Sequence, residues 1–385
     1  MKPLSKTSMY IEPSLTRKLF NMAKQYDDVI DFTLGDPDVP TPLGIKEAGC
    51  KAIMGNKTRY SQNAGLIELR KAISKYNKCR EGIDYNPENE ILVSVGAMEG
   101  LYLALLALIN NGDEVIIPAP YYVNYKQMVT MCGGTPVIVE DEDSVLRCSI
   151  DALKKSITPQ TKAIILNTPC NPTGVVMDDN YIREVAQIAI ENDLYVITDE
   201  VYKCLVYDKG CRPKSIASYE NMKECTIFIN SMSKEFCMTG WRLGYVMANS
   251  DIISAMTRLQ ENVAACAPLP SQYAAIEALR TDIDYSSEMA NIFRRRRDVL
   301  FEKLSKAKKI KCIKPEATFY AMVDISNTGM RSEEFAYALL ETEHVAVVPG
   351  IAYGKMCDNF IRIAFTIDEA KIREGVRRIC RFLDC

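Results

Sequence analysis

The sequence predicts an α/β protein with a large three-layer α/β/α domain, whose central sheet is mostly parallel, and a smaller α+β domain formed by both chain ends. Two observations predict this fold class. Through the middle of the chain, short uncharged runs rich in β-branched residues alternate with longer helical patterns, as in parallel sheets covered on both faces. A charged helical stretch then leads into a different mixture of strands and helices. At 385 residues, the chain also favours two domains over one core.

The elements of the large domain follow one another in a regular order. Apolar runs are separated by amphipathic patterns that end at glycine or polar residues. The expected strands are 90–96, 113–120, 135–140, 162–169, 194–200, 226–233 and 242–249, with helices at 100–112, 121–134 and 179–194. Ligands of such sheets bind at the carboxyl ends of the strands. We therefore expect the functional site at that edge.

A long charged helix is expected over residues 286–309. Its four consecutive arginines, Arg294–Arg297, suggest a contact with nucleic acid, but around a helix they point in all directions and no fully apolar face accompanies them. We therefore interpret this helix as a solvated connector.

The second domain follows the connector. Its expected strands are 317–325, 345–350 and 360–366, and its expected helices are 332–343 and 368–383. We expect residues 1–45 to contribute to this small domain, residues 46–282 to form the large domain, and residues 283–385 to form the connector and the rest of the small domain.

Composition and charge argue against several classes of partner. The formal net charge of −3 gives no reason to expect nucleic acid. The most apolar run, residues 101–109, is far shorter than the roughly 20 residues that span a bilayer. The start of the chain lacks the apolar stretch of a signal peptide. We expect a cytoplasmic protein with neither nucleic acid nor membrane among its partners.

The cysteines and the single histidine predict neither a disulfide framework nor a metal site. The fourteen cysteines are scattered, without a C-x-x-C pair, and are interpreted as mostly reduced small hydrophobic residues. His344 is the only histidine, which excludes multi-histidine metal sites and leaves a Ser-His-Asp triad only if His344 takes part. Its setting favours a surface role. Catalysis then depends on lysine, tyrosine, carboxylates or a cofactor.

Polar residues gather where three of the expected strands end. Asn171 lies in LNTPCNPTG, Asp199 in TDEVY, and Lys234 and Arg242 in SMSKEFCMTGWRLGY. At a fourth strand end, Gly96 begins a helix whose N-terminal N–H groups form an anion site. A phosphate site, a carboxylate for a pyridinium nitrogen and a lysine for a Schiff base are what pyridoxal phosphate chemistry requires.

These motifs, in this order, resemble those of the class I/II aminotransferases, which are fold-type I pyridoxal-phosphate enzymes that include aspartate and aromatic aminotransferases. The resemblance extends over nearly the whole chain, through FTLGDPDVPTP, RYSQNAGLIELRKAI, PAPYYVNY, PEATFYAMVDI, VPGIAYG and FIRIAF. It implies an enzyme that moves an amino group from an L-amino acid to a 2-oxo acid, with 2-oxoglutarate as the expected acceptor.

The resemblance implies a cofactor role for each matching residue. Lys234 forms the Schiff base with pyridoxal 5′-phosphate and later moves the substrate proton. Asp199 pairs with the pyridinium nitrogen, and Tyr202 and Asn171 hydrogen-bond the ring phenolate oxygen. Tyr122 stacks on the ring. The implied phosphate ligands are the backbone of Ala97 and Met98, the side chains of Ser231, Ser233 and Arg242, and Tyr60.

It also implies how substrate and subunits are arranged. Arg362 clamps the substrate α-carboxylate through a bidentate fork, with Asn171 and Gly35 beside it. Tyr60 reaches the phosphate of a neighbouring subunit, so a homodimer is implied. No metal is implied. The chain departs from the family at Ala97 and Met98, which lack the hydroxyl that many relatives carry, so phosphate binding there rests on the backbone.

Other interpretations of these residues exist. Lys203 follows Tyr202 directly but lacks the Ser-x-Ser lead and the downstream arginine of Lys234. Trp241 is interpreted as a packing residue beneath the lysine loop, and Glu200 as a structural neighbour of Asp199. Arg362 could be an ordinary strand arginine, although the resemblance favours the functional role.

The whole protein also has alternatives. A carbon–sulfur β-lyase of the same fold would use the same cofactor. A non-enzymatic regulator would normally add a DNA-binding domain, and only about 30 residues precede FTLGDPD. A nicotinamide dehydrogenase is poorly supported, because no G-x-G-x-x-G motif follows a strand.

Overall fold

The computed structural model describes residues 2–141, 144, 146–207, 214–280 and 284–384. Its largest sheet has seven strands, in the order β2 (Ile91–Ser94), β8 (Gly244–Met247), β7 (Thr226–Ser231), β6 (Tyr195–Asp199), β5 (Thr161–Asn167), β3 (Glu114–Pro118) and β4 (Thr135–Val139). Neighbouring strands are parallel except at β8, which is antiparallel to both β2 and β7. The predicted mostly parallel sheet is confirmed.

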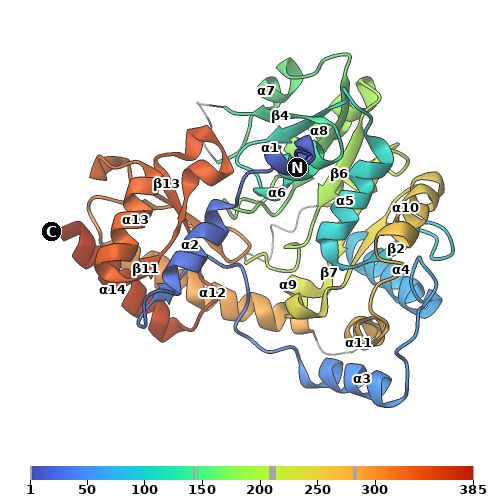
Figure 1. The fold of residues 1–385 in the computed structure, drawn as a ribbon, viewed down its shortest axis with the longest axis horizontal. Coiled ribbons are helices and arrows are strands. Elements are labelled where there is room, and N and C mark those ends of the chain that lie inside the picture. The colour runs from blue at the N-terminus through green and yellow to red at the C-terminus, as the bar shows by residue number, and fades with distance from the viewer. Residues whose placement is uncertain (1, 142–143, 145, 208–213, 281–283, 385) are drawn as a thin grey trace.

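Helices cover both faces of this sheet (Figure 1). Along β7, Ile227 and Ile229 face one apolar core and Phe228 faces the other, because successive side chains of a strand alternate in direction. One face carries α5 (Gly96–Leu108), α6 (Asn124–Met131) and α10 (Ser250–Val263). The opposite face carries α3 (Leu43–Met54), α4 (Ile67–Glu81), α7 (Ile150–Lys155), α8 (Asp179–Glu191) and α11 (Leu269–Arg280). The three predicted layers are therefore present.

A second, antiparallel sheet has the order β12 (Val348–Pro349), β13 (Phe360–Ala364), β10 (Tyr320–Asp324) and β9 (Lys311–Cys312). Three helices pack with it around a common core, α12 (Tyr285–Leu304), α13 (Ser332–Glu343) and α14 (Glu369–Asp384).

Segments near the N-terminus join this second unit. After α1 (Lys6–Tyr10), helix α2 (Leu15–Ala23) packs against β12 and β11 (Val345–Ala346), and β1 (Ile30–Asp31) pairs in parallel with β11. Both ends of the chain thus build the smaller unit, as expected. The exact domain bounds at residues 45 and 282 stay a prediction.

The expectation of a solvated surface along α12 is wrong for two of its four arginines. Arg296 and Arg297 are buried. The Arg296 guanidinium donates to the Thr366 carbonyl oxygen and pairs with Asp38, each at 2.8 Å. The Arg297 guanidinium lies 4.6 Å from the centroid of the Tyr207 ring. The helix also has a buried apolar stripe, formed by Met289, Phe293, Leu300 and Leu304. The arginines hid this stripe, because their long stems pack along apolar surface while their charged ends reach polar partners.

Three negative expectations can be compared with the described residues. No helix among them is both long and apolar enough to cross a membrane. Their His, Cys, Asp and Glu side chains form no group of three that could hold a metal ion. His344 ends α13 in the left-handed conformation, with φ 53°, and its ring lies 4.6 Å from that of Tyr26. It is half-buried and is not part of the cavity described below.

Candidate active site

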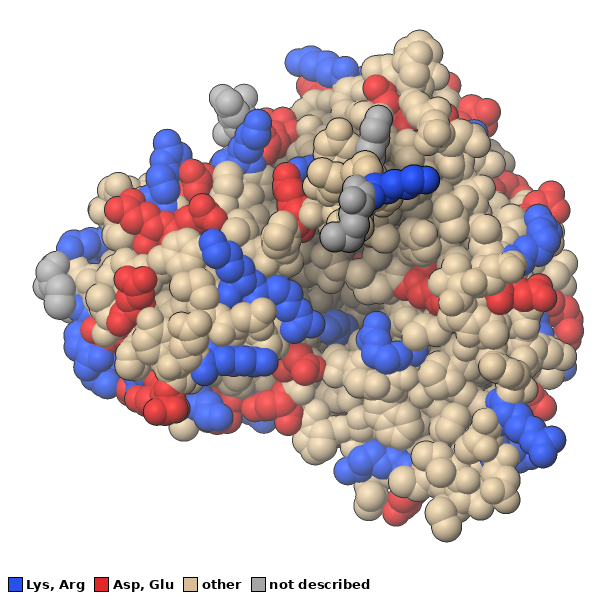
Figure 2. All heavy atoms as spheres, viewed as in Figure 1, with Lys and Arg blue, Asp and Glu red and all other residues tan. Residues whose placement is uncertain are grey.

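A cavity of about 670 Å³ opens at the carboxyl ends of β5, β6 and β7, a volume within the range of small-molecule sites. Figure 2 shows the hollow on this face, with Lys and Arg side chains along its rim. All but one of the site residues predicted from the sequence line this cavity: Gly35, Ala97, Met98, Tyr122, Asn171, Asp199, Tyr202, Ser231, Ser233, Lys234, Arg242 and Arg362. Residues far apart in the sequence therefore meet where the fold class predicted.

Lys234 projects into the cavity from the short helix α9 (Met232–Glu235), which directly follows β7. Its amine donates to the Gly35 carbonyl oxygen at 2.7 Å. Burial lowers the pKa of the Lys234 amine to about 8; Arg242 and Arg362 also lower it, and Asp36 opposes them. An amine with this pKa is available in its neutral, nucleophilic form near neutral pH.

Asp199 ends β6 and is almost completely buried. Its Oδ2 accepts a hydrogen bond from the Tyr125 hydroxyl at 2.7 Å, and its Oδ1 accepts one from the Val201 N–H at 3.3 Å. Burial still raises the pKa of the Asp199 carboxyl to about 6, because the charged form is poorly solvated there. The site therefore favours a positively charged partner for this carboxylate.

The strand ends that carry Asn171 and Asp199 are held together by Asn167. The Asn167 amide donates to the Asp199 carbonyl oxygen and its Oδ1 accepts from the Asn171 N–H, both at 2.9 Å. Just beyond, Tyr202 is buried with its hydroxyl 3.0 Å from that of Tyr320. Burial raises the pKa of the Tyr202 hydroxyl well above its ordinary value, so this group stays a hydrogen-bond donor at neutral pH.

Groups suited to binding an anion lie between α9 and the first turn of α5. The Ser231 hydroxyl donates to Ser233 Oγ at 2.8 Å. Arg242 lies in the left-handed region, with φ 52°, and a Cβ at Gly96 would come within 2.6 Å of its guanidinium. A side chain at position 96 would therefore displace the Arg242 guanidinium, and the φ of +76° at Gly96 also favours glycine. Val95 gives α5 no side-chain cap, so the first N–H groups of the helix remain suited to an anion.

Arg362 stands on β13 at the opposite wall of the cavity. Its guanidinium donates to Asn171 Oδ1 at 3.2 Å and to the Thr33 carbonyl oxygen at 2.5 Å. The Tyr320 and Tyr353 ring centroids lie 4.3 Å and 5.1 Å from it. Its Nε is buried and has no hydrogen-bond partner among the described residues. A buried, unpartnered donor is costly, and a substrate carboxylate would satisfy it.

The other candidate residues do not line the main cavity. Tyr60 is 86% exposed and does not line the cavity of its own chain. Lys203 is buried between Glu81 and Glu200, with ion-pair distances of 2.6 and 2.7 Å. Trp241 packs against Gly49 of α3 and donates to Thr41 Oγ1 at 3.1 Å. Lys203, Glu200 and Trp241 thus have structural surroundings, as interpreted from the sequence.

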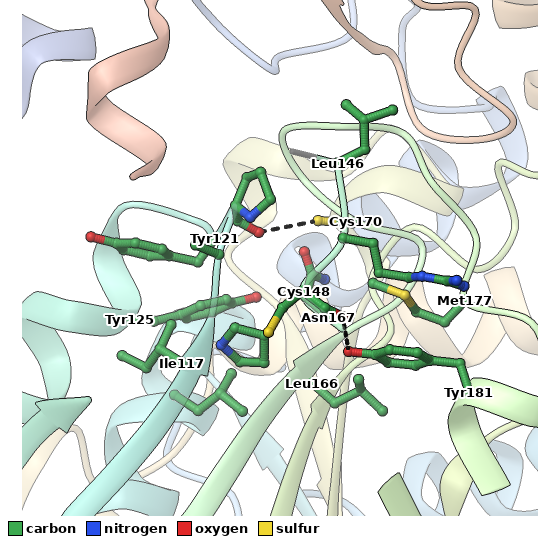
Figure 3. A pocket seen from close by; sticks show the side chains of 15 residues that line it. Ile117, Tyr121, Tyr125, Leu146, Cys148, Leu166, Asn167, Cys170, Met177 and Tyr181 are labelled. Atoms are coloured by element: carbon green, nitrogen blue, oxygen red, sulfur yellow. Dashed lines mark hydrogen bonds between the residues drawn. The ribbon is translucent and has the colours of Figure 1, made fainter. Parts of the chain in front are cut away.

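A smaller cavity lies behind the main one, with room for about one water molecule at roughly 20 Å³. Figure 3 shows Tyr125 and Asn167 on its wall, and both also line the main cavity. Nearby, the Cys170 thiol donates a hydrogen bond to the Pro120 carbonyl oxygen at 3.6 Å. The Tyr181 hydroxyl donates to the Cys148 carbonyl oxygen at 3.0 Å. The residues around this small cavity therefore help to hold the loops that carry Asp199 and Asn171.

Sequence reasoning missed several residues of the site. Tyr125, Asn167 and Tyr320 were not singled out, although Tyr125 and Tyr320 lie within motifs that were quoted, PAPYYVNY and PEATFYAMVDI. Buried tyrosines are ordinary core residues, so only their hydroxyl partners identify them. The cavity also includes Ser14, Thr16 and Arg17, from the N-terminal end of α2. No motif marked Thr16 or Arg17.

Comparison with known proteins identifies relatives over the whole length. The family model for aminotransferase class I and II matches residues 27–379. The chain is 41% identical to an aspartate aminotransferase of Pyrococcus abyssi, over 97% of this chain and 96% of the relative. It is 38% identical to an aromatic-amino-acid aminotransferase of Thermococcus litoralis, over 97% and 96% respectively. The crystal structure of an aromatic aminotransferase from Pyrococcus horikoshii superposes with a TM-score of 0.90 at 40% identity, covering 95% of this chain and 98% of that one.

Proposed function

The chain belongs to the class I and II aminotransferase family, and from that premise we propose that it binds pyridoxal 5′-phosphate in the main cavity and uses 2-oxoglutarate as amino acceptor. In the overall reaction, the amino group and hydrogen on Cα of an L-amino acid are exchanged for the carbonyl oxygen of a 2-oxo acid. No external oxidant or reductant is required.

The residues of the cavity fit this cofactor. A phosphate matches the hydroxyls of Ser231 and Ser233, the Arg242 guanidinium and the first N–H groups of α5. A protonated ring nitrogen matches Asp199, a carboxylate whose pKa burial raises to about 6 and which a positive charge beside it would stabilise. The Tyr122 ring also lines the cavity, suited to stacking on a flat ring. The observation that carries the proposal is this set: a buried carboxylate and a lysine amine of lowered pKa facing one anion site.

Pyridoxal phosphate, when bound, supplies an aldehyde that joins to amines and a ring that withdraws electrons from the substrate Cα. Lys234 would hold the cofactor through its amine and would act as the base toward the substrate Cα proton. Asp199 would pair with the ring nitrogen, and Tyr202 and Asn171 would donate hydrogen bonds to the ring oxygen. Arg362 holds the α-carboxylate through its free Nε edge, which fixes Cα near Lys234.

Covalent trapping tests the attachment site. Borohydride reduction of the loaded protein, followed by peptide mass analysis, is expected to find the cofactor mass on the Lys234 peptide. Lys203 is the internal control, because its amine is already paired with two carboxylates. The cofactor mass on another lysine, or no bound cofactor, contradicts the proposal. With an amino-acid panel, formation of glutamate from 2-oxoglutarate supports it, whereas pyruvate and ammonia without an acceptor indicate a lyase.

We also propose that the enzyme is a cytoplasmic homodimer in which Tyr60 reaches the phosphate of the neighbouring subunit. The exposure of Tyr60 supports this, as do the exposed apolar side chains of Leu43, Ile53 and Met54 on α3, since clustered exposed apolar residues mark interaction surfaces. Light scattering is expected to give twice the chain mass. A monomer that retains full activity contradicts the shared site.

A further inference from the structure

The C-terminal end of α4 contacts two turns of the site from outside the main cavity. Its last two residues are Arg80 and Glu81, and neither lines the cavity. Each forms an ion pair with a residue that directly follows a site residue in the sequence, and these partners are Glu235 and Lys203 respectively. One helix end therefore joins two turns that are separate in the sequence.

The first of these turns is α9, where Glu235 follows Lys234 and is buried. The Arg80 guanidinium pairs with Glu235 Oε1 at 2.9 Å, and the hydroxyls of Tyr76 and Ser286 donate to the same oxygen. Tyr76 belongs to α4 and Ser286 to the first turn of α12. The turn that carries Lys234 is therefore fixed to two other helices through one carboxylate.

The second turn follows β6, where Glu200 and Lys203 directly follow Asp199 and Tyr202 and are buried. The Lys203 amine lies 2.6 Å from Glu81 Oε2 and 2.7 Å from Glu200 Oε2. A carboxylate in the last turn of a helix is opposed by the helix dipole. The ion pair with Lys203 accounts for the presence of Glu81 at that position.

These contacts fix geometry more than they add stability. The cost of taking charges out of water offsets most of the attraction within a buried ion pair, and Glu81, Glu200 and Lys203 together keep one excess negative charge. An ion pair near the same helix end offers a contrast. Lys78 and Asp84 lie 2.5 Å apart, but both side chains are 61% exposed and neither residue adjoins a site residue.

We propose that Arg80 and Glu81 are positioning residues, which hold the turn of Lys234 and the turn of Asp199 and Tyr202 at a fixed separation. In the proposed function, Lys234 must reach the substrate Cα while the other two residues contact the cofactor ring. An error in the separation of the two turns therefore misplaces the proton transfer. The inference rests on the proposed function, because it assigns a task to groups behind that site.

The test is a double-mutant cycle in the cofactor-loaded full chain, with Arg80→Ala, Glu81→Ala and the double variant. Each single change is expected to lower kcat about 10- to 100-fold with little change in KM, because misplaced groups slow the chemical step and leave substrate binding intact. Either change releases the same helix end, so the double variant should lose about as much as the worse single variant. Lys78→Ala and Asp84→Ala are the matched controls and should keep the kcat of the unmodified protein.

Amide hydrogen exchange gives a second readout that requires neither cofactor nor turnover. In the cofactor-free full chain, Arg80→Ala and Glu81→Ala are each expected to speed exchange in both turns, residues 199–205 and 231–236. The two control variants should change neither turn. Arg80→Lys keeps a cation beside Glu235 and is expected to recover part of both effects.

The single variants leave no buried charge alone, because Glu235 keeps two hydroxyl donors and Lys203 keeps Glu200. Either variant decides the exchange test, since each should loosen both turns. Unchanged kcat, losses that multiply in the double variant, or exchange that changes only in the turn nearest each substitution overturn the inference. If the unmodified protein transfers no amino group and carries no cofactor on Lys234, the proposed function has failed instead, and the exchange result still decides whether α4 links the two turns.

Discussion

The two walls of the active-site cavity differ in how far the protein satisfies its own polar groups. On the large-sheet wall, Asp199 and Ser231 have hydrogen-bond partners within the chain, and Asn167 ties two loops together. On the smaller-sheet wall, Arg362 keeps a free buried Nε and Arg17 has no ion pair among the described residues. In the proposed function, the first wall holds the cofactor, which stays bound, and the second wall binds the substrates, which exchange.

The largest effect is expected from breaking the first wall at Asp199. Asp199→Ala removes the carboxylate that we propose as the partner of the ring nitrogen, so the transamination rate should fall about 10²- to 10³-fold. Tyr202→Phe is the matched control from the same loop; it removes one hydroxyl and should cost about 10-fold. Steady-state kinetics with one donor and 2-oxoglutarate measures both. Equal, small losses in the two variants would mean that Asp199 does not face the ring nitrogen.

The second wall is tested at Arg362. Arg362→Lys keeps the charge but loses the planar fork, so kcat/KM should fall about 10- to 100-fold for every amino acid. The expected loss is the same for dicarboxylic and monocarboxylic donors, because each carries an α-carboxylate. A loss confined to one substrate class would contradict the assignment of Arg362.

The smallest effect concerns the stability of the cofactor-free protein. Burial raises the pKa of Asp199 from 3.8 to about 6. The folded state therefore binds this proton more tightly than the unfolded state, and the resulting stabilisation is lost as the pH rises from about 4 through about 6. At pH 8, Asp199→Asn should raise the free energy of unfolding by about 1–3 kcal/mol. Urea denaturation at pH 8 and pH 5 measures the difference, which should shrink at the lower pH. A less stable variant at pH 8 would contradict this reasoning.

The same comparison explains which parts could be predicted from the sequence. The layered sheet was predictable because uncharged strands alternate with amphipathic helices, and residues such as Asn171, Asp199 and Lys234 follow strand ends in motifs. Tyr125 and Tyr320 could not be recognised, because a buried tyrosine looks like core until its hydroxyl partner is known. Arg17 has no motif at all. It reaches the cavity only because α2 packs against β11 and β12, strands more than 300 residues away in the sequence.

The arginines of α12 show the opposite error. The four consecutive arginines predicted a helix exposed to solvent, yet Arg296 and Arg297 are buried with polar and aromatic partners. Charge patterns describe the ends of side chains, whereas burial also depends on their stems and on which partners the fold brings near. Local patterns thus predicted elements reliably and predicted partners poorly.

The origin of the open wall has a consequence for how such enzymes diversify. Ser14, Thr16 and Arg17 come from a short N-terminal helix, whereas Asp199, Ser231 and Lys234 come from the central sheet and the turn after it. Changes in the helix can therefore alter the lining of the cavity without altering the residues that the central sheet supplies. Two relatives with different names, an aspartate aminotransferase and an aromatic-amino-acid aminotransferase, each align with 97% of this chain. Selection can therefore change part of the cavity lining through a short terminal segment.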